Sequence, residues 1–163
     1  MKTLLIVWYS RTGGSKQMAL AAARGARAES DVRVVLKNAA RATAGDVLSA
    51  DGLIFAAPEN LAALAGGMKE FFDRNYYKLL DRTNGKPYAA LICAGSDGAN
   101  AQRQLERIAT GLRLKRIAET QIANTAAQTA EAIWASKHIA AEELKRCAAT
   151  GAALAAGLSA GIF

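Results

Sequence analysis

Apolar residues are gathered along this chain into five short blocks, separated by longer stretches of mixed polarity. Three of the blocks are nearly continuous apolar runs, as expected of central strands that are covered on both faces. They are Thr3–Tyr9, Gly52–Ala57 and Tyr88–Ala94. The other two, Val32–Leu36 and Ile117–Ala123, are more mixed and suit the edges of a sheet. The pattern therefore predicts five strands.

The stretches between these blocks carry the spacing of three to four residues that is typical of helices. The clearest has an apolar face opposite a charged face, which places Glu70 four residues before Arg74. Its apolar face consists of Met68, Phe71, Phe72, Tyr76 and Leu79. In a second stretch the apolar face consists of Ala101, Leu105, Ile108 and Leu112. We expect both faces to lie in the core.

Two further helices are predicted, from Lys16 to about Ala28 and from about Ala140 to Leu158. The segment Asn124–Ile139, which contains Trp134, has no clear period and is interpreted as irregular. Strands that alternate with helices imply an α/β fold, with a parallel sheet and right-handed crossovers.

Three loops are the candidate ligand contacts. In folds of this kind, ligands bind beyond the carboxyl ends of the strands. The segments Ser10–Ser15, Pro58–Gly67 and Gly95–Asn100 follow the three most apolar strands, and all are rich in Gly, Ala, Ser or Asn. We expect them to converge on a single pocket at one end of the sheet.

The first of these loops has the chemistry of an anion site. It combines three hydroxyl residues, Ser10, Thr12 and Ser15, with Gly13 and Gly14. The N–H groups at the start of the next helix are free, and the helix dipole adds partial positive charge there. The glycines let the backbone approach a phosphate closely. The loop is predicted to hold the phosphate of a nucleotide-like cofactor, and the alternative is an ordinary turn with a serine cap.

Two well-known phosphate loops are excluded by spacing. A Walker loop needs Ser or Thr directly after its lysine, whereas Lys16 is followed by Gln17. The dinucleotide fingerprint needs glycines spaced G-x-G-x-x-G, which the adjacent Gly13 and Gly14 do not supply.

Composition indicates one globular domain over residues 1–163, with 52% hydrophobic residues and a formal charge of +7. The 14 acidic and 21 basic residues are interspersed, and no run of five or six basic residues occurs. We therefore expect a solvated basic surface and no nucleic-acid partner.

The residues that most often carry side-chain catalysis or metal binding are sparse. Cys93 lies in an apolar run and is interpreted as a buried small hydrophobe, while the single His138 has no second histidine to pair with. The apolar start of the chain is too short for a secretory signal, and the tail Cys147–Phe163 reads as a packed helix rather than a membrane span. We expect a cytoplasmic location, no metal and no catalytic side chain.

The three loops resemble those of flavodoxin-like flavoproteins, close to the short NAD(P)H-dependent FMN oxidoreductases and quinone reductases. Leu5–Ser15 is similar to the family's phosphate loop, and Ala57–Asn60 with Gly66–Arg74 resembles its second loop and helix. Cys93–Ala99 lies where the family's third loop borders the isoalloxazine ring of the flavin. The likeness implies a three-layer fold, with a five-stranded parallel sheet of order 2-1-3-4-5 and helices on both faces.

The resemblance also implies which residues contact FMN. The phosphate is expected on Ser10, Thr12, Gly13, Gly14 and Ser15, with Arg11 at the rim. The ring is expected near Pro58, Glu59, Asn60 and Leu61, and its pyrimidine side near Gly95, Ser96, Asp97 and Gly98. For Arg11 and Glu59, a solvated role is the alternative.

The function implied is electron transfer from NAD(P)H through bound FMN to a quinone or similar small molecule. A flavodoxin-type electron carrier without its own turnover is the first alternative, and a flavin-binding sensor or scaffold is the second. The chain departs from flavodoxins because it is basic and has no Tyr or Trp in Pro58–Gly67 or Gly95–Asn100. The open ring face would admit an acceptor, or be covered by a partner chain bearing Trp134 in a homodimer.

Two other protein classes with this sheet order do not fit. A response regulator needs an aspartate at the end of the third strand, where Ala56-Ala57-Pro58 stands. A low-molecular-weight tyrosine phosphatase needs an arginine six residues after its cysteine, and Cys93 is followed there by Ala99.

Overall fold

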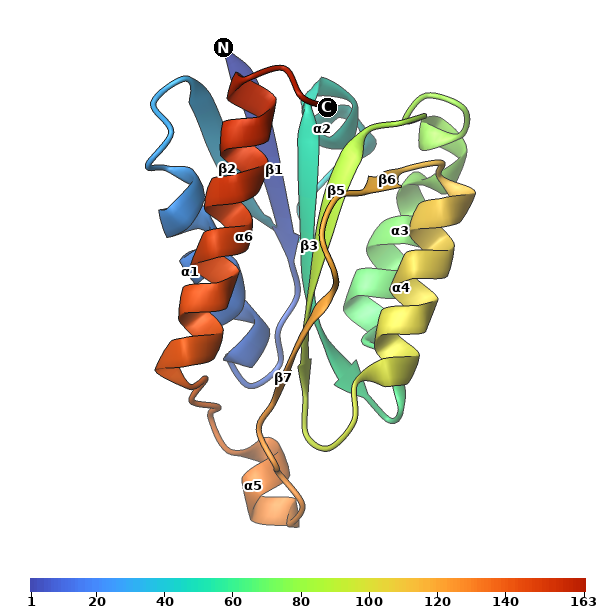
Figure 1. The fold of residues 1–163 in the computed structure, drawn as a ribbon. Coiled ribbons are helices and arrows are strands. Elements are labelled where there is room, and N and C mark those ends of the chain that lie inside the picture. The colour runs from blue at the N-terminus through green and yellow to red at the C-terminus, as the bar shows by residue number, and fades with distance from the viewer.

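A parallel sheet runs through the centre of the computed structural model, which describes all 163 residues (Figure 1). Four strands lie side by side in the order β2-β1-β3-β5. They are β1 (Lys2–Trp8), β2 (Val32–Asn38), β3 (Gly52–Asn60) and β5 (Pro87–Ala94). Two short strands, β6 (Lys115–Arg116) and β7 (Gln121–Asn124), both pair parallel to β5 and complete that edge. The predicted five-position order is confirmed.

The fifth strand is broken, whereas the sequence predicted one strand over Ile117–Ala123. The ladder to β5 is interrupted between β6 and β7, where Thr120 and Arg116, the last residue of β6, bind the neighbouring helix α4 (Ala99–Gly111). Thr120 donates a hydrogen bond to Glu106 of this helix at 2.7 Å, and Arg116 forms an ion pair with the same carboxylate at 2.6 Å. Periodicity carries no signal of these contacts with α4.

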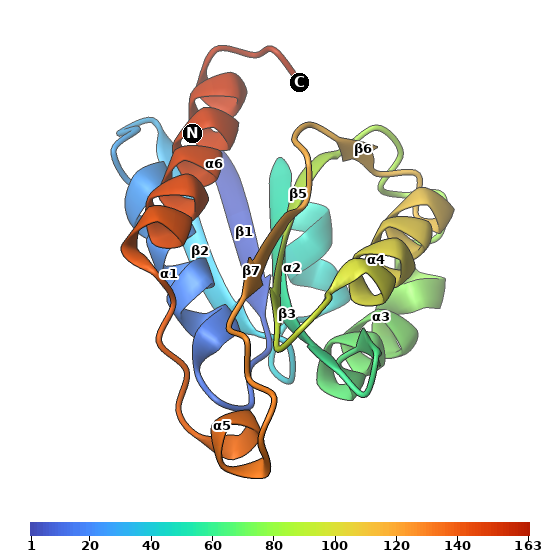
Figure 2. The ribbon, with the colours of Figure 1, turned by 60° about the horizontal axis from the view of Figure 1, so that its bottom comes forward.

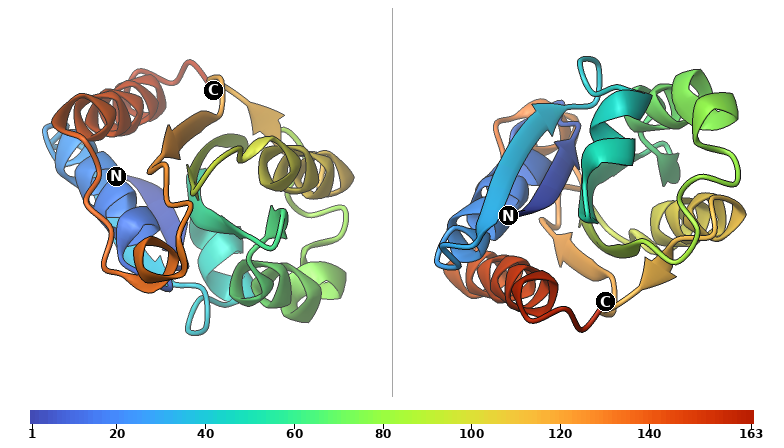
Figure 3. Two further views of the ribbon diagram at one scale, coloured as in Figure 1. Left: turned by 90° about the horizontal axis from the view of Figure 1, so that it is seen from below. Right: turned by 90° about the horizontal axis from the view of Figure 1, so that it is seen from above.

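Helices cover both faces of the sheet. On one face lie α1 (Gly14–Ala26) and α6 (Ala141–Ser159), and on the other α2 (Ala44–Ser49), α3 (Gly66–Leu79) and α4 (Figures 1 and 3). Alternate residues of the strands feed the two layers, so that Leu5 and Phe55 pack in one core and Leu4 and Ile54 in the other. This is the predicted three-layer arrangement.

The two amphipathic helices form where the sequence predicted them. In α3, Met68, Phe71, Phe72 and Leu79 are buried, but Tyr76 is 39% exposed. Glu70 and Arg74 form the expected ion pair at 3.4 Å. In α4, Ala101 and Leu105 are fully buried, and Leu112, which caps the helix, is buried as well.

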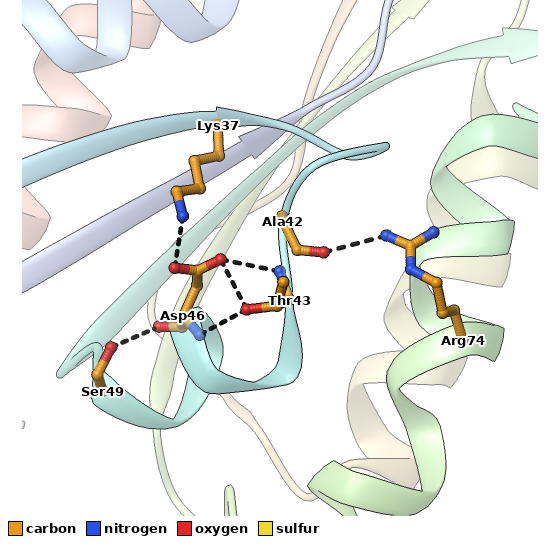
Figure 4. Close-up of polar contacts among 6 residues, drawn as sticks. All are labelled: Lys37, Ala42, Thr43, Asp46, Ser49 and Arg74. Atoms are coloured by element: carbon orange, nitrogen blue, oxygen red, sulfur yellow. Dashed lines mark hydrogen bonds and ion pairs between the residues drawn. The ribbon is translucent and has the colours of Figure 1, made fainter.

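Helix α2 was not predicted, because its six residues are too few to show a period. A capping box begins it: Asp46 N–H donates to Thr43 Oγ1 at 3.3 Å, and Thr43 N–H donates to the Asp46 carboxylate at 2.9 Å (Figure 4). Burial alone would raise the pKa of Asp46, but hydrogen bonds from Lys37 and Thr43 outweigh it and hold the pKa below its usual value. Arg74 of α3 donates to the Ala42 carbonyl at 3.0 Å and ties the two helices together.

Helices α1 and α6 pack closely through small residues. Gly25 of α1 lies against the carbonyl of Ala148, and Gly151 of α6 lies against the carbonyl of Ala22, so that a Cβ at either glycine would overlap backbone. The tail is thus a packed helix, as predicted, and no helix of the structure is both long and apolar enough to cross a membrane. Because α1 begins at the candidate phosphate loop, this contact also fixes the direction in which its first turn points.

We predict that Gly25→Ala lowers the free energy of unfolding by about 1–3 kcal/mol, because the added methyl group forces two backbones apart. Urea denaturation followed by circular dichroism measures the change. Gly111→Ala is the matched control, since Gly111 ends α4 with no atom near its Cβ position. The control should match the wild type or exceed it by up to about 1 kcal/mol. Equal losses in both variants would contradict the packing argument.

Candidate functional site

The loops at the carboxyl ends of β1, β3 and β5 converge on one cavity of about 630 Å³. Eleven of the fourteen site residues predicted from sequence line it. These are Ser10, Arg11, Thr12, Gly14, Ser15, Pro58, Glu59, Asn60, Leu61, Gly95 and Ser96. The other three, Gly13, Asp97 and Gly98, lie outside the lining. Gly13 and Gly98 are instead the left-handed residues that begin α1 and α4, with φ of 93° and 90°.

The first loop presents free hydrogen-bond donors to this cavity. Ser10 Oγ accepts from Gly13 N–H at 3.0 Å, which closes the turn. The N–H groups of Gly14, Ser15 and Lys16 begin α1 and donate to no protein acceptor. Ser15 is 1% exposed, and its hydroxyl has no hydrogen-bond partner. A buried donor left unpaired beside three free amides fits a bound phosphate.

Only glycine fits at position 14. A Cβ there would overlap Cys93 Sγ of β5 and would lie 3.3 Å from the Ile139 side chain. Burial raises the pKa of the Cys93 thiol, and the Lys137 ammonium offsets only part of that rise. Cys93 is therefore a neutral packing residue on the cavity wall, which confirms its interpretation as a small hydrophobe.

The second loop is a tight hairpin between β3 and β4 (Ala63–Leu64). Its two central residues, Leu61 and Ala62, have φ of 51° and 59°, the left-handed region that glycine or asparagine usually occupies. Leu61 is fully exposed at the tip. The hairpin is held against α4, because Gln104 accepts from Leu64 N–H at 2.7 Å.

Glu59 joins the second loop to the third. Its carboxylate accepts hydrogen bonds from Gly98 N–H at 2.9 Å and from Ala101 N–H at 3.2 Å, at the start of α4. A negative charge at this helix terminus is favourable. The side chain therefore acts as a brace between loops rather than as a solvated acid.

A fourth segment lines the cavity and was missed from the sequence, where Asn124–Ile139 was interpreted as irregular. It contains the short helix α5 (Ala130–Trp134), which lies beyond the carboxyl ends of the strands (Figure 2). Residues beyond the sequence-predicted set that line the cavity are Ala62, Gly66, Cys93, Ala94, Thr125, Ala127, Ile133, Trp134 and Lys137. The one signal in the sequence was a tryptophan in a stretch without apolar period. His138, in the same segment, is exposed.

The charged groups around the cavity offer no acid–base pair. Arg11, Glu59 and Lys137 line it. Glu59 braces α4, and the Lys137 ammonium donates to three backbone carbonyls at the end of α5. Arg11 is exposed and forms no ion pair. The arrangement can hold an anionic ligand, but any redox chemistry must come from that ligand.

The model of the NADPH-dependent FMN reductase family matches residues 26–129 of this chain. The chain belongs to this family. A flavodoxin from Aquifex aeolicus is 38% identical over 98 residues, which are 60% of this chain and 53% of that protein. The chain thus spans about half the length of this curated relative. The protein is a flavodoxin-like, FMN-binding flavoprotein.

Solved structures share the fold. An archaeal flavodoxin superposes with a TM-score of 0.77 at 16% identity, covering 96% of this chain and 99% of its own. A WrbA-like flavodoxin from Agrobacterium tumefaciens gives 0.76 at 17% identity, covering 96% of each chain. The matched family range begins after Ser10–Ser15, so the role of that loop rests on its own geometry.

The strained hairpin generates a prediction about this flavoprotein. We expect Ala62→Gly to raise the free energy of unfolding by about 0.5–1 kcal/mol, because glycine adopts positive φ without steric cost. Ala63→Gly is the control. It is the next residue, lies in the extended strand β4, and should lower stability by about 0.5–1 kcal/mol. Thermal unfolding of both variants measures the two effects. If the free energy of unfolding changed in the same direction in both, the interpretation of Ala62 as strained would be wrong.

Proposed function

We propose that this protein is an FMN-dependent oxidoreductase that transfers electrons from NAD(P)H, through bound FMN, to a quinone or similar small acceptor. The observation that carries the proposal is the buried, unpaired hydroxyl of Ser15 beside the free amides of α1, in a cavity open to solvent. The family match supports the reductase class. The choice of acceptor and of NAD(P)H is our proposal.

The chain's own residues would bind and orient the cofactor. Hydroxyls of Thr12 and Ser15 and the amides of Gly14 and Ser15 would hold the phosphate, with the dipole of α1 adding positive charge. Bound FMN supplies the hydride and electron chemistry, which no side chain of the cavity offers. Backbone groups of Pro58, Asn60, Leu61, Gly95 and Ser96 would contact the ring.

The position of these loops is fixed before any ligand binds. The Glu59 carboxylate holds the second loop to the start of α4. Asn124 donates to the carbonyl of Ser96, and Gln128 donates to the carbonyl of Gly95 at 3.2 Å, so the third loop is held as well. A cavity that needs no reordering loses less free energy on binding.

A flavodoxin-type electron carrier is the second candidate, because the curated relative is named a flavodoxin. The two functions use the same cofactor and differ in turnover. Only the oxidoreductase reacts with NAD(P)H and a small acceptor by itself.

The discriminating experiment is an absorbance titration of the purified protein with FMN, followed by NADPH and then a benzoquinone. We expect the flavin bands to shift on binding, bleach with NADPH and recover with the quinone. Binding without bleaching by NADPH or NADH would favour the carrier. No binding of FMN at high concentration would overturn the cofactor assignment.

A substitution tests the phosphate site. Ser15→Ala removes a buried hydroxyl that has no partner in the free protein. We expect the free energy of unfolding to rise by about 1 kcal/mol, whereas the dissociation constant for FMN rises about tenfold. Riboflavin, which lacks the phosphate, is the matched ligand, and its affinity should not change. If fluorescence titrations showed that both ligands bind equally more weakly, Ser15 would not be a phosphate contact.

A further inference from the structure

Helix α5 is held by side-chain hydrogen bonds at both ends, although it contributes nothing to the core. It has five residues, none of them buried. Thr129 Oγ1 nevertheless caps its start by accepting from Ala132 N–H at 3.2 Å. At its end, the Lys137 ammonium donates to the carbonyls of Ala132, Ile133 and Ala135, each at 2.7 Å. A helix this short is unstable alone, so these bonds maintain a conformation that buries no residue in the core.

The same segment is fastened to the phosphate loop. Lys137 N–H donates to the Thr12 carbonyl at 2.8 Å. The Gln17 side chain, in the first turns of α1, donates to the Lys137 carbonyl at 2.7 Å and accepts from Ile139 N–H at 3.2 Å. Viewed from below in Figure 3, α5 lies over the start of α1. The place of α5 is therefore fixed relative to the anion site.

The fixed position of α5 places Trp134 at the wall of the cavity. It ends α5, is 75% exposed, and is the one aromatic residue that lines the cavity. Ile133 beside it also lines the cavity and is 57% exposed. A large apolar ring is thus exposed to water at the cavity wall, on a helix that is held at both ends. Such a ring can stack on a flat ligand.

We propose that Trp134 is a preformed stacking platform for the planar ring of the ligand whose phosphate the first loop holds. Resting on the function proposed above, that ring is the isoalloxazine of FMN. The platform comes from the same chain as the phosphate loop, and Thr12 and Gln17 act as positioning residues that set its distance from the phosphate. A platform fixed in advance adds affinity because little conformational freedom is lost on binding.

The test is FMN and riboflavin binding to Trp134→Ala and Trp134→Phe, followed by flavin fluorescence. Stacking on one aromatic side chain is lost in the alanine variant, so both ligands should bind about tenfold more weakly or worse. Because the platform acts on the ring, this pattern differs from that of Ser15→Ala, which affects FMN alone. Phenylalanine should restore most of the affinity. It should also leave the bound flavin more fluorescent, since indole quenches flavin emission by contact.

Trp8→Phe is the matched control, since Trp8 is the only other tryptophan and does not line the cavity. It should retain wild-type affinity and quenching. Trp134→Ala should fold normally, because α5 buries no residue. Affinity within about twofold of wild type for Trp134→Ala would overturn the platform. So would a change in its sedimentation alone, which would make α5 an interface between copies. Failure of the wild type to bind FMN would overturn the proposed function itself.

Discussion

The close contact between Gly14 and Cys93 is the constraint on which the rest of the site depends. Because no Cβ separates them, the first turn of α1 rests directly on β5, two strands away from β1 in the sheet. Ile139 packs at the same point, so the segment that carries α5 meets the phosphate loop there. The free amides of α1 are thereby aimed into the cavity by contacts from three separate parts of the chain.

Much of this architecture follows from local sequence. The buried strands could be read from continuous apolar runs, because a strand covered on both faces has no polar positions. The loops could be read because the carboxyl ends of parallel strands meet at one edge, whatever the rest of the chain does. Hydroxyls and glycines directly after Tyr9 therefore predicted an anion site before any contact was known.

The parts that could not be predicted depend on side-chain contacts, both local and distant, that leave no period in the sequence. The fifth strand is interrupted where Thr120 and Arg116 bind Glu106 on α4. Helix α2 exists because Thr43 and Asp46 cap it and Arg74 holds it from α3. Helix α5 exists because Lys137 closes its end and Gln17 anchors it. In each case a few side chains decide the backbone, and no period in the sequence records them. Glu59 could likewise be read as a solvated acid until Gly98 and Ala101 were seen to donate to it.

The two walls of the cavity come from opposite layers of the fold. The hairpin tip at Leu61 is attached to α4 on one face, through Gln104 and Asn100. Helix α5 is attached to α1 on the other face, through Gln17. The carboxyl ends of the strands lie between them, so the cavity is bounded by elements from both helix layers. The left-handed turn at Leu61 and Ala62 keeps the hairpin tight at a steric cost of about 1–2 kcal/mol per residue. A relaxed, longer loop would reach further across the cavity. The left-handed pair therefore keeps this wall short, while the other wall is extended by α5, which buries no residue of its own.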